Sequence, residues 1–152
     1  MSFAGKQSGM QQYKKMSVQG GVDSATPHRL IQMLMEGVLE KIATAKFHME
    51  KNEIASKGEN ISVAISIIDG LRVSLDKSTG GEIAQNLDDL YEYMGRILLQ
   101  ANLKNDVRLL DEVAGLLNEI KSAWDAIPDE VVFEHADKAK ASSGSKAVSN
   151  GS

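Results

Sequence analysis

The sequence predicts an all-α protein: an antiparallel bundle of about four long helices, with a short N-terminal arm or helix and a disordered C-terminal tail. Two observations favour this class. Apolar residues recur at three- and four-residue steps along four segments, as they do on one face of a helix. The 152 residues include only one Trp, three Tyr and three Phe, while Leu, Ile, Val, Met and Ala are plentiful. That composition suits helix packing better than a β-sandwich.

Composition divides the chain into three parts. Residues 1–22 begin with a Gly-, Ser- and Gln-rich stretch and form a mobile N-terminal arm, which includes Tyr13. Residues 23–130 carry the periodic apolar segments and form a single helical-bundle domain, as expected for a chain of this length. Residues 131–152 become rich in Ala, Lys, Ser and Gly with little to bury, so we expect a disordered tail.

The first long helix is expected over residues 27–52, because Thr26 is a good N-cap and Pro27 suits the first helical position. A capping-box pattern in Ser56–Glu59 predicts the start of a second helix, which runs to about Asp76. The two apolar stripes are Ile31, Leu34, Val38, Ile42, Ala45 and Met49, and then Ile61, Ala64, Ile65, Ile68, Leu71 and Leu75.

The central helix is expected over Gly80–Asp106, with Thr79 as its N-cap and Glu82 completing a capping box. A last helix should start at an Asn105 cap and end near Ile127. The stripes of these two helices are Ile83, Leu87, Leu90, Met94, Ile97, Leu98 and Ala101, and then Leu110, Val113, Leu117, Ile120 and Trp124. Short connections between four such helices favour antiparallel neighbours.

Several apolar residues fall off these stripes and exceed what a bundle core needs, about three positions in seven. They are Leu30, Met33, Val63, Ile67, Val73, Leu99, Leu109, Leu116 and Ile127. One interpretation is a broad core with ordinary scatter of exposed apolar side chains. The other is an exposed apolar groove that accepts a helix of another chain. Spacing alone leaves both open.

Composition excludes several function classes. The chain has no Cys, which excludes disulfides, Cys-ligated zinc and thiol catalysis. Its net charge is −4, and no Lys/Arg cluster exceeds the pair Lys14–Lys15, so we expect no nucleic-acid partner. No apolar run is long enough to span a membrane, and the N-terminus lacks the apolar region of a signal peptide. We therefore expect a cytoplasmic protein without membrane insertion.

No motif for a cofactor or metal is found. A di-iron bundle needs Glu-x-x-His on two helices, but the residue three before His48 is Ala45. One enzymatic alternative remains, because Lys51 follows His48 by three residues on a predicted helix. Histidine phosphotransfer bundles pair an exposed His with a nearby Lys, although the Gly that usually follows that Lys is Asn52 here.

Specific runs of residues resemble the FliS family of flagellin export chaperones. Val22–Pro27 and Leu30–Gly37 are similar to the opening helix of that family. Ser74–Asp76 and Gly80–Asn102 are similar to its central part, and Glu112–Trp124 to its last helix. The resemblance covers about residues 13–128.

The resemblance implies a small cytoplasmic bundle without catalytic activity or cofactor. Such proteins bind the disordered C-terminal segment of flagellin, prevent its premature polymerisation and keep it competent for the flagellar type III export gate protein FlhA. Tyr13 matches the aromatic residue of the family's arm, which is thought to cover the binding surface. The expected flagellin-binding groove is lined by Leu30, Met33, Leu99, Leu109 and Leu116. A bundle that chaperones or regulates a different flagellar protein is a further alternative.

Overall fold

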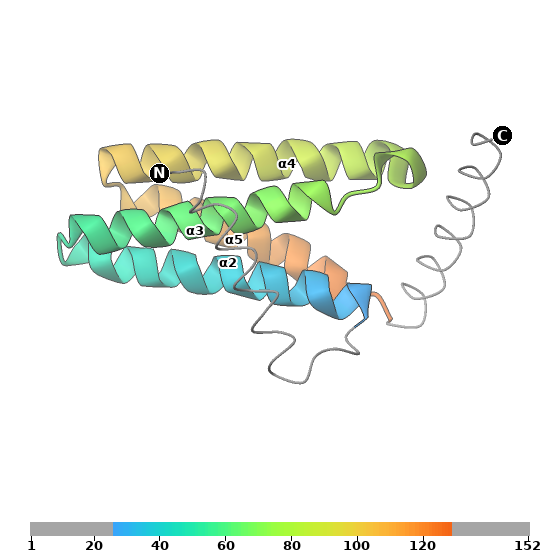
Figure 1. Cartoon of the computed structure of the whole chain (residues 1–152), viewed down its shortest axis with the longest axis horizontal. Helices are drawn as coiled ribbons and strands as arrows, with labels where there is room; N and C mark the ends of the chain where they lie inside the picture. The colour runs from blue at the N-terminus through green and yellow to red at the C-terminus, as the bar shows by residue number, and fades with distance from the viewer. Residues whose placement is uncertain (1–25, 129–152) are drawn as a thin grey trace, which may run out of the picture.

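The structure is a computed structural model that describes residues 26–128 and contains four α-helices within them. They are α2 (Pro27–Glu50), α3 (Ile54–Val73), α4 (Lys77–Lys104) and α5 (Val107–Asp125). Consecutive helices run antiparallel along one long axis (Figure 1). The predicted all-α bundle is confirmed for these residues. Tyr13, the arm over residues 1–22 and the tail over 131–152 lie outside the described residues.

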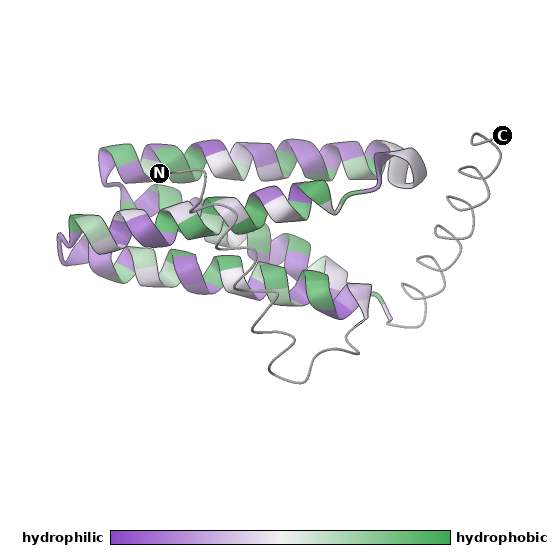
Figure 2. Cartoon of the chain, viewed as in Figure 1, coloured by the Kyte–Doolittle hydropathy of each residue, from purple (hydrophilic) through white to green (hydrophobic). Residues whose placement is uncertain are grey.

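The helices pack in a closed ring in which each contacts the next and α5 returns to α2. The connections are only residues 51–53, 74–76 and 105–106, and such short connections keep consecutive helices as antiparallel neighbours. Apolar and polar residues alternate in bands along each helix (Figure 2). The core inside the ring is built from side chains that are at most 7% exposed: Met35, Val38, Ile42, Ala45, Met49, Ile61, Ala64, Ile67, Ile68, Leu71, Tyr91, Met94, Ile97, Leu98, Ala101, Leu110, Val113 and Leu117.

The start of α2 is as predicted. The Thr26 hydroxyl oxygen accepts a hydrogen bond from the Arg29 backbone N–H at 3.1 Å, and Pro27 occupies the first turn. The predicted capping box at Ser56 is wrong, because α3 already begins at Ile54, with Glu53 as N-cap. Asn52 adopts a left-handed φ of 59°, which ends α2 and returns the chain directly into α3.

The predicted caps of the last two helices are also wrong. Asp76 caps α4 by accepting from the backbone N–H groups of Ser78 and Thr79, at 3.1 and 3.2 Å, so Thr79 belongs to the first turn. Asn105 ends α4 in a left-handed conformation (φ 54°), and the neighbouring Asp106 caps α5 instead. In each case an aspartate within three residues of the expected cap makes the capping bonds.

A kink interrupts the first turns of α4. Gly81 has φ 54° and ψ −125°, so the backbone is not helical at this point. Residues with a Cβ rarely adopt this conformation, and glycine allows it. The turn before the kink is tied back to the bundle by Lys77, whose Nζ lies 3.0 Å from an Asp88 carboxylate oxygen.

Asp88 also joins α4 to α3. Its other carboxylate oxygen accepts from Arg72 Nε at 2.8 Å, and the residue is 8% exposed. The hydrogen bonds from Arg72 and then Lys77 lower the pKa of Asp88 to about 2. Two cations therefore hold one carboxylate at the place where α3, the kinked turn and α4 meet.

Some of the off-stripe apolar residues belong to a broad core, and others are exposed. Ile67 was expected off the stripe, but it is 1% exposed and belongs to the core. The reason is that α3 packs against both α2 and α4, so its buried arc is wider than one stripe. Val73 and Leu99, in contrast, are 85% and 52% exposed. A broad core explains only part of the excess.

Two residues of the predicted central stripe are not in the core. Ile83 is 72% exposed and Leu90 is 37% exposed, whereas Tyr91 is buried. Ile83, Leu90 and Ile97 are spaced seven residues apart on one side of α4, and their exposure falls from 72% to 37% to 7% toward the C-terminal end of the helix. Helix periodicity places all three on the same side, so what differs along α4 is the cover that the other helices provide.

Candidate functional site

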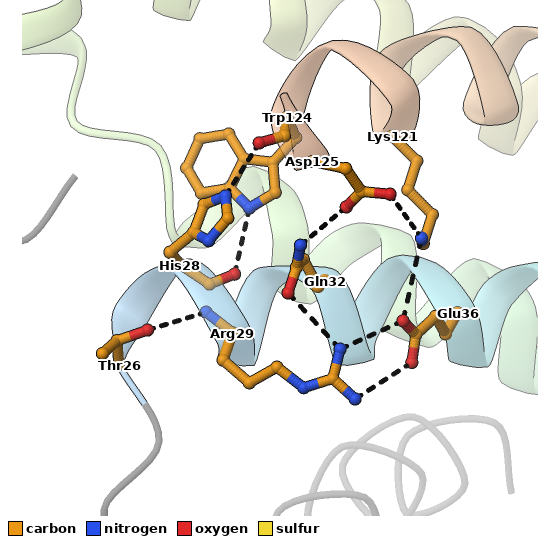
Figure 3. Close-up of polar contacts among 8 residues, drawn as sticks. All are labelled: Thr26, His28, Arg29, Gln32, Glu36, Lys121, Trp124 and Asp125. Atoms are coloured by element: carbon orange, nitrogen blue, oxygen red, sulfur yellow. Dashed lines mark hydrogen bonds and ion pairs between the residues drawn. The ribbon is translucent and has the colours of Figure 1, made fainter. Parts of the chain in front are cut away.

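The C-terminal half of α5 is fastened to the start of α2 (Figure 3). His28 Nε2 donates to the backbone oxygen of Trp124 at 2.7 Å, and Trp124 Nε1 donates to the backbone oxygen of His28 at 3.0 Å. The two rings stack with their centroids 5.0 Å apart. His28 is buried. This reciprocal pair fixes the position of the last turn of α5.

A more exposed polar network continues the same contact (Figure 3). Gln32 Nε2 donates to Asp125 at 2.7 Å, and Lys121 contacts both Asp125 (2.7 Å) and Glu36 (3.7 Å). The hydrogen bonds from Lys121 and then Gln32 lower the pKa of Asp125. Exposed pairs of this kind contribute little stability each. Together with the His28–Trp124 pair they connect the last turns of α5 to α2.

The contact between α4 and α5 lies nearer the other end of α5. The Tyr93 hydroxyl donates to the Glu112 carboxylate, and this bond raises the pKa of Tyr93. Arg96 lies over the Tyr93 ring at 5.6 Å. Beyond this pair the two helices separate, since α4 stays along its own side of the bundle while α5 crosses toward the start of α2 (Figure 1). With 28 residues, α4 is also longer than the 19-residue α5.

Apolar side chains flank the place where the helices separate. Ile83, Leu87 and Leu90 lie one turn apart on α4, on a face that adjoins Tyr93 and therefore faces α5. Leu116 follows Glu112 by one turn on α5 and faces α4 for the same reason. We call this surface the α4–α5 seam and define it as Ile83, Leu87, Leu90, Leu116 and Ile120. Ile83 and Leu90 are exposed, and the other three are partly buried.

The structure places the five predicted groove residues on different faces. Leu116 belongs to the seam, and Leu109 lies about one turn before Glu112 on the same flank of α5. Leu99 lies on the opposite side of α4, one turn from Asn102, whose backbone oxygen accepts from Lys57 of α3 at 2.9 Å. Leu30 is exposed on the first turns of α2, with partly buried Met33 nearby. These residues therefore do not converge on one surface.

Sequence reasoning missed four of the five seam residues, because it placed them in the core stripes of their helices: Ile83, Leu87, Leu90 and Ile120. Helix periodicity gives no signal that separates Ile83 and Leu90 from the core, since Ile97 lies seven residues beyond Leu90 and is buried. Their exposure follows from the divergence of α5 from α4, which depends on contacts between α5 and α2.

The surroundings of His48 differ from those the phosphotransfer alternative requires. His48 Nδ1 lies 3.0 Å from the Glu53 carboxylate, and its ring meets Phe47 edge-on. Lys51 lies over the Phe47 ring at 4.5 Å instead of beside the histidine. Within residues 26–128 no group of three or more His, Asp or Glu side chains could hold a metal ion. None of the four helices there combines the length and apolarity that crossing a bilayer requires.

The described residues form a helical bundle with exposed apolar side chains along α4, a surface typical of proteins that bind other chains. Comparison with known proteins agrees with this class. The profile of the family "Flagellar protein FliS" matches residues 9–131. The flagellar secretion chaperone FliSB of Pseudomonas aeruginosa is 54% identical over 118 residues, which cover 78% of this chain and 94% of that protein.

The flagellar secretion chaperone FliS of Salmonella typhimurium is 46% identical over 130 residues, covering 85% of this chain and 96% of the relative. The FliS of Vibrio cholerae is 46% identical over 121 residues, covering 80% and 89% respectively. The chain belongs to the FliS family of flagellar secretion chaperones.

Proposed function

We propose that this protein is a cytosolic export chaperone that binds the C-terminal segment of flagellin, with the α4–α5 seam as part of the binding surface. The observation that carries the proposal is the exposed apolar row on α4, with Ile83 72% and Leu90 37% exposed. Leu30, Met33, Leu99 and Leu109 would extend the surface around the bundle to other faces. A long client segment that wraps the bundle would reach all of them.

The physical demands of such a client support this assignment. A segment that orders only on binding loses conformational entropy, so its complex needs a large apolar contact for affinity. Apolar residues spread over several faces of a small bundle provide more area than one groove does. An amphipathic client helix in the seam would bury Ile83 and Leu90 against its own apolar face.

Binding at these faces would have two consequences for export. The client's apolar residues would be covered, which would prevent premature polymerisation of flagellin. The complex would also hold the segment in a form that FlhA can receive. Tyr13 would cover part of the surface when flagellin is absent, and such a covering arm lowers the apparent affinity by the fraction of time the surface is closed. The protein would act by binding alone, without catalysis.

Titration with a flagellin C-terminal peptide tests this proposal. An Ile83→Asp variant should retain the helical circular dichroism of the bundle and bind the peptide much more weakly. Val73→Asp is the matched control, because Val73 is 85% exposed on α3 and lies outside the seam. Equal affinities of wild type and Ile83→Asp would remove the seam from the binding surface. Binding of another flagellar protein, but not flagellin, would favour a different client.

A further inference from the structure

The acidic side chains of α4 and α5 fall into two groups. Those that face away from the seam are paired with cations: Asp88 with Arg72 and Lys77, Glu92 with Arg96, Asp111 with Lys46, and Asp125 with Lys121. Four others have no Lys or Arg partner in the part of the chain that the structure describes: Glu82, Asp89, Glu112 and Glu119.

These four carboxylates border the seam. Glu82 and Asp89 lie two turns apart on α4, in a row that continues to Tyr93 and runs beside the apolar row. Glu112 and Glu119 lie two turns apart on α5, on either side of Leu116. All four residues are exposed. The hydrogen bond from Tyr93 to Glu112 joins the two acidic rows where the helices meet.

The stretches of α4 and α5 that form this surface carry no cations, and the next cation along α4, Arg96, lies over the Tyr93 ring where the two helices meet. Neither Ser78–Gly95 of α4 nor Leu109–Ile120 of α5 contains a Lys or Arg. The next cation along α5, Lys121, is directed to Glu36 of α2. The seam is therefore an apolar surface between two acidic rims.

We propose that the seam selects an amphipathic client helix whose apolar face is flanked on both sides by Lys or Arg. This inference rests on the proposed function and adds the chemistry of the helix that this surface accepts. A docked helix displaces water from the rims, and a carboxylate that loses water without gaining a cation is penalised. Basic flanks supply those cations and attract the client before contact. The acidic row from Glu82 to Tyr93 contains twelve residues and rises about 16 Å, so it matches about three turns of helix.

Two designed helical peptides test the inference without relying on flagellin. They share one apolar face, and one carries Lys on both flanks while the other carries Glu. The full-length chain should bind the Lys-flanked peptide at least about tenfold more tightly in fluorescence anisotropy at low salt, because several rim charges act together. The preference should shrink as salt is added, since exposed charges are screened.

A double reversal, Asp89→Lys with Glu119→Lys, should abolish or invert the preference. The matched control is Glu40→Lys with Glu59→Lys, which makes the same charge change at exposed positions of α2 and α3. Circular dichroism and thermal melting verify that both variants fold. Equal affinity for the two peptides, or a preference that survives the rim reversal, would overturn the inference. So would a dimer in sedimentation velocity that Ile83→Asp dissolves, because the occupant would then be a second copy.

A parallel titration with the flagellin segment separates this inference from the proposed function. Flagellin binding without a peptide preference would refute the acidic-rim selection and leave the proposed function standing. A peptide preference that the rim reversal removes, without flagellin binding, would support the seam chemistry and refute flagellin as the client.

Discussion

Replacing Ile83 with alanine should weaken flagellin binding without destabilising the bundle. Ile83 is 72% exposed in the free protein, so a client that covers it completely can bury about that fraction of the side chain. Full burial of a large aliphatic side chain contributes about 1.5–3 kcal/mol, so covering the exposed part of Ile83 contributes about 1–2 kcal/mol. Loss of that contribution corresponds to a rise in Kd of about 5- to 30-fold.

The same exposure predicts that folding is unaffected. An exposed side chain contributes little to the core, and alanine is the better helix former, so the free energy of unfolding should change by less than about 0.5 kcal/mol. Binding is measured by titration calorimetry with the flagellin C-terminal segment, and stability by urea unfolding. Val73→Ala is the control, because Val73 is 85% exposed on α3.

Two results would refute this reasoning. An unchanged Kd for Ile83→Ala would mean that no client side chain covers Ile83. An equal loss of affinity in Val73→Ala would mean that exposed apolar residues contribute wherever they lie, so that the seam has no special role.

Three further predictions concern stability. Met94→Ala, at a fully buried position, should lower the free energy of unfolding by about 2–5 kcal/mol in urea, and a loss below 1 kcal/mol would contradict the packing described. Gly81→Ala should lower the free energy of unfolding by about 1–3 kcal/mol. The positive φ of this position is the only cause, because an added Cβ would have open space around it. An unchanged melting temperature would show that the kink is absent. The pKa of Asp88 is lowered from 3.8 to about 2, so its stabilising contribution is present above about pH 4 and is lost as the pH falls through about 2. The free energy of unfolding of Asp88→Asn should therefore depend less on pH in that window than that of wild type. The same pH dependence in both proteins would refute the contact of Asp88 with Arg72 and Lys77.

Local patterns in the sequence predicted the four helices and most of the core. Thr26 and Pro27 predicted the start of α2, and the structure agrees. Thr79 and Asn105 failed as caps because Asp76 and Asp106 make the capping bonds instead. Spacing rules identify residues able to cap a helix, but they do not rank two candidates a few residues apart.

Such rules could not predict the seam, because it depends on contacts between residues that are far apart in the sequence. His28 and Trp124 are 96 residues apart in sequence, and their reciprocal hydrogen bonds hold the end of α5 on α2. That contact draws α5 away from Ile83 and Leu90 on α4. Their exposure is therefore a property of the assembled bundle, whereas the burial of Met94 or Leu117 follows from helix periodicity.

Calorimetric titration of the full-length chain with the C-terminal segment of flagellin tests the central claim most directly. We predict saturable binding with a large negative heat-capacity change, together with a gain of helical circular dichroism in the peptide, because apolar burial is coupled to client folding. If titration of the folded chaperone gives neither heat nor a change in the peptide's circular dichroism, the claim that flagellin is the client is contradicted.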